Sequence, residues 1–122
     1  MPPMSIVVGL LGTAEGQAAL TAAVTEARER NVPLAVVVSR PEEDREAVEA
    51  VGARLADAGV SSRIVPGTGD LAEDLVRTAH GSGAELIVIG LRRRSPVGKL
   101  ILGSGAQRIL LEAPCPVLAV KP

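Results

Sequence analysis

The chain has 122 residues, of which 47% are hydrophobic and none is Phe, Tyr or Trp. The core must therefore be built from Val, Leu, Ile and Ala, and no aromatic ring is present on which the bases of single-stranded nucleic acid could stack. The formal net charge of −1 indicates no general attraction to nucleic acid or to an acidic membrane, and the single cysteine excludes an internal disulfide.

The first residues, MPPMSIVVGLLGT, contain no basic segment, and their apolar run is too short to cross a membrane. We therefore expect a cytoplasmic protein. This apolar run is the first of five that are rich in β-branched residues and bounded by turn signals, which is typical of strands buried on both faces of a parallel sheet. The five predicted strands are SIVVGLL, PLAVVVS, SSRIVP, ELIVIGL and CPVLAV.

Apolar residues recur at helical spacing between these strands, which predicts four helices. Thr13 precedes the first helix as a cap, and Pro41 is expected to open the second. Asp70 and Glu73 have capping-box spacing for the third, and the fourth follows residues 103–105. The alternation predicts a single α/β domain over residues 1–122, with a mostly parallel sheet between helices on both faces.

The longest predicted connection between regular elements runs from Gly90 to Gly103, and long loops are often functional. A helix that begins at Gly103-Ser104-Gly105 presents free backbone N–H groups and its positive dipole end to whatever lies there. The nearby cations could add charge-assisted hydrogen bonds to an anion; they are Arg92, Arg93, Arg94 and Lys99. The alternative is a solvated loop and a plain loop-to-helix junction.

The same stretch, GLRRRSPVGKLILGS, resembles the signature of universal stress proteins. That signature is Gly, two residues, Gly, nine residues, Gly, then Ser or Thr, so that Gly90 matches its first glycine and Gly103-Ser104 its last pair. Two positions depart from the family pattern. Arg93 stands at the second glycine, and Leu11 stands where nucleotide-binding members usually carry an Asp that contacts the adenosine.

The resemblance implies a three-layer fold with a five-stranded parallel sheet in the order 3-2-1-4-5. It also implies a stress-response or regulatory binding module with ATP, AMP or another adenine nucleotide as ligand, accompanied by Mg²⁺ if bound, in a partly degenerate site. Family members commonly dimerise through the last strand, so we expect a homodimer through Cys115 to Val120.

The predicted site lies between the ends of the first and fourth strands. Gly90 and residues 103–105 are expected to hold phosphates by backbone and hydroxyl donors, with Arg92, Arg93 or Lys99 as charge partners. The nucleoside is expected beside Leu11, Gly12 and Thr13, with Val38 and Ser39 as walls. No catalytic and no metal-ligating residue is predicted.

Two alternatives remain open at this point. In the first, the pocket no longer binds nucleotide and the chain is a dimeric protein-interaction module. In the second, the chain is a slow ATPase, which would need a general base and usually Mg²⁺, and the first strand offers no carboxylate for this purpose.

Overall fold

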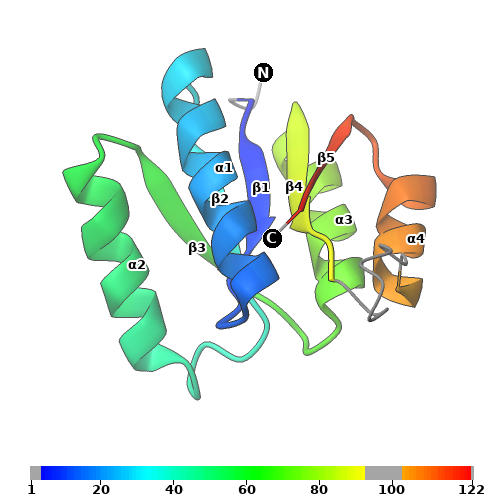
Figure 1. The fold of residues 1–122 in the computed structure, drawn as a ribbon, viewed down its shortest axis with the longest axis horizontal. Helices are drawn as coiled ribbons and strands as arrows, with labels where there is room; N and C mark the ends of the chain where they lie inside the picture. The colour runs from blue at the N-terminus through cyan, green and yellow to red at the C-terminus, as the bar shows by residue number, and fades with distance from the viewer. Residues whose placement is uncertain (1–3, 93–102, 122) are drawn as a thin grey trace.

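A computed structural model describes residues 4–92 and 103–121 of the chain (Figure 1). Within these residues, strands and helices alternate as predicted. The strands are β1 (Ile6–Gly9), β2 (Leu34–Val38), β3 (Ser62–Pro66), β4 (Leu86–Gly90) and β5 (Val117–Val120). The helices are α1 (Ala14–Arg30), α2 (Arg45–Asp57), α3 (Leu71–Ser82) and α4 (Ser104–Glu112).

The five strands form one parallel sheet in the order β3-β2-β1-β4-β5, which confirms the strand order implied by the resemblance. β1 lies in the middle, where Ile6 pairs with Leu34 of β2 and with Leu86 of β4. Because both faces of a central parallel strand are covered, such a strand needs an almost uninterrupted apolar sequence. The order also sets the carboxyl ends of β1 and β4 side by side.

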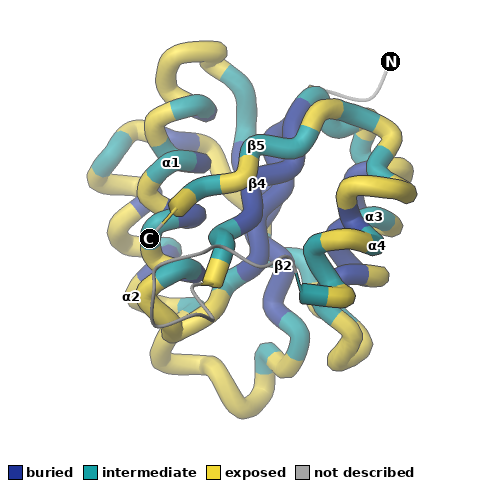
Figure 2. Tube along the Cα trace, turned by 45° about the vertical axis from the view of Figure 1, so that its right-hand side comes forward, coloured by how far each residue is buried: buried dark blue, intermediate teal, exposed yellow. Residues whose placement is uncertain are grey.

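The sheet is the middle layer of three, with α1 and α2 on one face and α3 and α4 on the other (Figure 1). Successive side chains of a strand point to opposite faces. Ile6 and Val8 therefore pack with α1 and α2, while Val7 packs with α3 and α4. Figure 2 shows the inner strands in the dark blue of buried residues, whereas β5 is half-buried or exposed at the edge. The predicted three-layer α/β fold is confirmed.

The predicted caps of two helices are confirmed. The Thr13 hydroxyl accepts a hydrogen bond from the Gly16 amide at 3.1 Å, and the Asp70 carboxylate accepts one from the Glu73 amide at 3.2 Å. These bonds satisfy N–H groups that have no partner inside the helix, and so they define where α1 and α3 begin. No helix in the described part of the chain is long and apolar enough to cross a membrane.

The predicted start of the second helix is wrong, because α2 begins at Arg45 and not at Pro41. Pro41 instead follows Arg40 in a turn in which the Glu43 amide donates to the Arg40 carbonyl at 3.1 Å. The fixed φ of proline suits the second position of such a turn as well as it suits the first turn of a helix. Sequence patterns alone do not separate the two.

A buried carboxylate organises the turn between β3 and α3. Asp74 is fully buried, and its Oδ2 accepts a hydrogen bond from the Thr68 amide at 2.8 Å. Its Oδ1 accepts bonds from the Thr68 hydroxyl at 2.9 Å and from Arg77 at 2.6 Å. A Cβ on Gly67 would collide with the same carboxylate, so glycine is needed there. Asp74 thereby ties the turn to α3 and fixes the N-terminal end of that helix.

Candidate functional site

A cavity of about 280 Å³ lies where β1 and β4 end, at the edge of the sheet onto which α1, α3 and α4 open with their N-terminal ends. Doubly wound sheets bind ligands at the carboxyl ends of their strands, between two neighbouring strands whose following connections lead to opposite sides of the sheet. β1 and β4 are such a pair, because β2 lies on one side of them and β5 on the other. The lining residues are Gly9, Leu11, Glu15, Gly16, Ala19, Leu71, Ala72, Leu75, Val88, Ile89, Gly90, Arg92, Gly103, Ser104, Gly105, Ala106 and Ile109.

The N-terminal end of α4 forms one wall of the cavity. Gly103 is the capping residue and offers no side-chain acceptor, and the first backbone hydrogen bond of the helix runs from the Gln107 amide to the Gly103 carbonyl at 3.0 Å. The N–H groups of residues 104–106 therefore have no partner within the helix, and these residues line the cavity. The first turn of α4 contains no acidic residue. The cavity thus receives the positive end of a helix dipole.

An ion pair joins Glu15 in the first turn of α1 to Arg92, the second residue after β4. Arg92 Nε donates to Glu15 Oε1 at 3.2 Å, and both residues line the cavity. The Glu15 side chain is only 16% exposed, whereas that of Arg92 is 62% exposed. The backbone N–H of Glu15 lowers the pKa of its carboxyl most strongly, the Arg92 and Thr13 side chains lower it further, and partial burial opposes them. Glu15 is therefore ionised at neutral pH.

Two glycines of the cavity are required by close backbone packing. A Cβ on Gly90 would collide with the backbone carbonyl of Glu15, and a Cβ on Gly16 would lie 2.5 Å from the Cβ of Leu11. Glycine permits such approaches because it has no side chain. The glycine that matches the start of the family signature therefore lets α1 sit directly on the end of β4.

The remaining wall is apolar. Leu71, Ala72 and Leu75 of α3 and Ile109 of α4 line it, and Leu11 lies 42% exposed at the end of β1. Ligand sites in proteins are commonly apolar clefts with a few polar groups that set orientation. The cavity fits that description, with the amides of α4 and the Glu15–Arg92 pair as its polar groups.

The structure brings six of the predicted site residues together: Leu11, Gly90, Arg92, Gly103, Ser104 and Gly105 all line the cavity. Four others lie outside its lining. Gly12 and Thr13 are exposed, with Thr13 engaged in capping α1, while Val38 is fully buried in β2 and Ser39 is half-buried beyond it. The predicted site residues Arg93 and Lys99 lie outside the residues that the structure describes.

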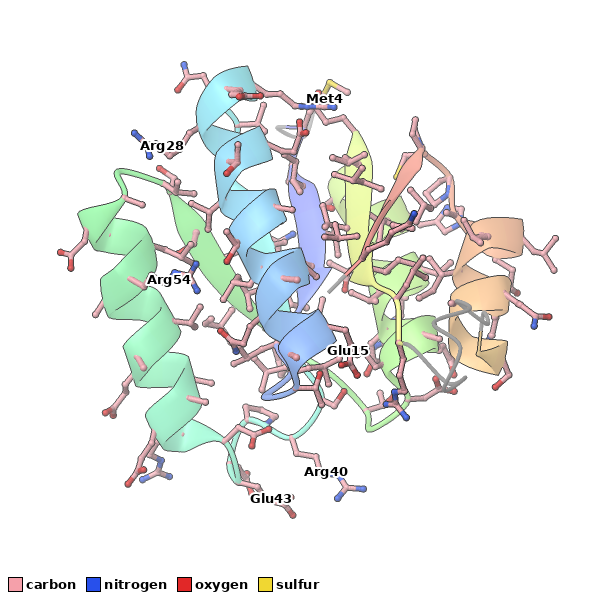
Figure 3. The ribbon with its side chains drawn as sticks, viewed as in Figure 1. Met4, Glu15, Arg28, Arg40, Glu43 and Arg54 are labelled. Atoms are coloured by element: carbon pink, nitrogen blue, oxygen red, sulfur yellow. The ribbon has the colours of Figure 1, made fainter. Side chains whose placement is uncertain are left out.

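Sequence reasoning did not single out Glu15 or the α3 wall. The signal for Glu15 is its place in the first turn of the helix that follows β1, which turns its side chain toward the ends of the neighbouring strands (Figure 3). Its partner Arg92 lies 77 positions away in the sequence. The pairing becomes visible only once β1 and β4 are adjacent.

Comparison with known proteins agrees with this architecture, since the profile of the universal stress protein family matches residues 4–121. The chain belongs to the universal stress protein family. It is 44% identical to a universal stress protein of Mycolicibacterium smegmatis, in an alignment that covers 96% of this chain and 97% of the relative.

Solved structures of the family share the fold closely. A universal stress protein from Archaeoglobus fulgidus matches with a TM-score of 0.78 and 34% identity, covering 97% of this chain and 98% of the other. A universal stress protein from the same organism, solved in complex with dAMP, matches with a TM-score of 0.74 and 29% identity over 99% of this chain and 100% of the other. The family and the fold expected from the signature are confirmed.

Proposed function

We propose that this universal stress protein is a cytoplasmic regulatory module of the stress response that binds an adenine nucleotide in the cavity between β1 and β4. The single observation that carries the proposal is the N-terminal end of α4, where residues whose N–H groups have no partner within the helix line a partly open, mostly apolar cavity. Phosphate groups bind readily at such helix ends. The dAMP complex of a relative from Archaeoglobus fulgidus supports the choice of nucleotide.

The phosphate would accept hydrogen bonds from the amides of residues 104–106, and the Ser104 hydroxyl could add one more. The nucleoside would lie against Leu11 and Leu71, where apolar surface takes the place of a polar contact. A cavity of about 280 Å³ lies near the lower end of the usual range of about 300–1,000 Å³ for ligand pockets, which favours a monophosphate such as AMP. Mg²⁺ would arrive with ATP on its phosphates, because Glu15, the carboxylate among the described lining residues, is already paired with Arg92.

The test is a calorimetric titration of AMP into the wild type and two variants. Ser104→Asp places a carboxylate in the first turn of α4, which favours the helix by about 0.3–1 kcal/mol but repels a phosphate. We expect it to weaken AMP binding at least tenfold without lowering the melting temperature, whereas the neutral Ser104→Asn retains binding. Equal affinity in all three proteins would contradict the proposed position of the phosphate.

A dimeric interaction module is the second candidate, and we propose that the chain forms a homodimer through the segment from Cys115 to Val120 in either case. Two observations support this interface. β5 is the last strand of the sheet, so its outer edge has no partner in the described chain. Leu111 of α4, which is 85% exposed, is a large apolar side chain without cover. No heat of binding with millimolar AMP, ADP or ATP would favour the interaction module over nucleotide binding.

A further inference from the structure

The described lining of the cavity carries two charges, and they cancel. Glu15 and Arg92 are the charged residues in that lining, and they pair with each other through Nε and Oε1 at 3.2 Å. The charge of Arg92 is therefore already neutralised by Glu15 before a phosphate binds. A phosphate that enters meets a helix dipole, which attracts it, and an arginine whose charge the Glu15 carboxylate already neutralises.

Glu15 is held firmly in that position. Its main chain belongs to the first turn of α1, where the Thr13 hydroxyl caps the helix by accepting a hydrogen bond from the Gly16 amide. Its carbonyl is packed against Gly90 so closely that no Cβ fits between them. Its side chain is mostly buried, and Arg92 holds one carboxylate oxygen. The negative charge therefore stays beside the cavity whatever ligand arrives.

We propose that Glu15 determines specificity by charge: by neutralising Arg92, it withholds the cation that would otherwise favour a triphosphate over a monophosphate. The inference rests on the proposed nucleotide binding. A cavity of about 280 Å³ is small enough that a bound phosphate lies within about one Debye length, ~8 Å, of the carboxylate, where screening is incomplete. Coulomb attraction to an unpaired arginine would grow with the charge of the ligand, so Glu15 withholds more attraction from ATP than from AMP.

The test measures the binding of AMP and of ATP by calorimetry, without Mg²⁺. Four proteins are compared: the wild type, Glu15→Gln, Arg92→Gln and the control Glu49→Gln. Glu49 lies exposed on α2 and outside the cavity lining, so its variant changes the net charge of the protein equally. We expect Glu15→Gln to shift the ratio of the two dissociation constants toward ATP by about three- to tenfold. Arg92→Gln, which leaves Glu15 unpaired, should shift the ratio the other way.

An unchanged ratio in Glu15→Gln, with both nucleotides still bound, would overturn the charge selection and leave the proposed function intact. An equal shift in Glu49→Gln would overturn it too, because the effect would then be one of net charge. If none of the four proteins bound either nucleotide, the proposed function would fail and this inference with it. A shift confined to Glu15→Gln, with the reverse shift in Arg92→Gln, supports the proposal.

Discussion

Gly90 at the end of β4 and Glu15 in the first turn of α1 touch backbone to backbone, with no space for a Cβ between them. The contact joins two segments that are far apart in the sequence, and Arg92 strengthens it by pairing with the Glu15 side chain. One wall of the candidate site is therefore assembled by close packing of main chain on main chain. The residues that make this contact therefore contribute both to the stability of the protein and to the shape of the site.

Gly90→Ala should destabilise the protein, because the new methyl group meets a carbonyl that belongs to a helix and cannot swing away. Overpacking of this kind typically costs about 1–3 kcal/mol in the free energy of unfolding. The measurement is the midpoint of urea denaturation. Gly52→Ala in α2 is the matched control: its Cβ would meet nothing within 4 Å, so the exchange should stabilise the helix by about 0.5–1 kcal/mol. Equal midpoints for the two variants would contradict the tight contact at Gly90.

Asp74→Asn should also destabilise the protein. Both carboxylate oxygens of Asp74 accept hydrogen bonds, from Thr68 and Arg77, so the amide nitrogen of Asn must face a donor wherever it is placed. A buried polar group left without its partner costs about 1–3 kcal/mol. Asp57→Asn, on the exposed end of α2, makes the same chemical change and should alter the free energy of unfolding by less than about 0.5 kcal/mol.

The same carboxylate predicts a dependence of stability on pH. Burial raises the pKa of Asp74, but the hydrogen bonds from Thr68 and Arg77 outweigh burial, so the pKa lies below its usual value. A group whose pKa is lowered by folding stabilises the native state above its unfolded pKa, about 3.9 for Asp, and loses this contribution as the pH falls through the folded pKa. When urea midpoints are measured from pH 6 down to pH 2, the urea concentration at the midpoint should therefore begin to decrease once the pH is below about 4. The decrease should be less steep in Asp74→Asn. Parallel curves would contradict this role.

The homodimer can be tested at the outer edge of β5. The Pro116 and Val120 carbonyls accept hydrogen bonds from β4 and the residue after it, so the alternate residue Ala119 directs its N–H and C=O away from the sheet. Ala119→Pro removes that outward N–H without removing a bond to β4. We expect a dimer for the wild type and for Ala119→Ser, and a monomer for Ala119→Pro, by light scattering after gel filtration. A monomeric wild type, or a dimeric Ala119→Pro, would contradict the interface.

Much of the fold could be predicted from local patterns. Apolar β-branched runs predicted each strand, and Thr13 and Asp70 indicated two helix starts correctly, because a capping bond is made between neighbours in the sequence. The start of α2 was misplaced because Pro41 suits a turn and a helix equally well. The order of the strands came from the resemblance, since periodicity does not determine which strands lie side by side.

The candidate site was only partly predictable, for a related reason. The glycines and Ser104 lie in a recognisable signature, so they could be proposed from the sequence. The ion pair of Glu15 with Arg92 and the α3 wall depend on packing between distant segments. Val38 illustrates the opposite case: its place at the end of β2 suggested a wall of the site, but its side chain packs into the core between the sheet and the α1–α2 layer.

The most direct test of the nucleotide site is to follow the backbone amides of ¹⁵N-labelled protein by NMR while AMP is added. Binding at the N-terminal end of α4 predicts saturable shifts of the Ser104, Gly105 and Ala106 amides, because these N–H groups would donate to the phosphate. If these three amides stayed in place at millimolar AMP, whether other signals moved or none did, the helix end would not be a phosphate site.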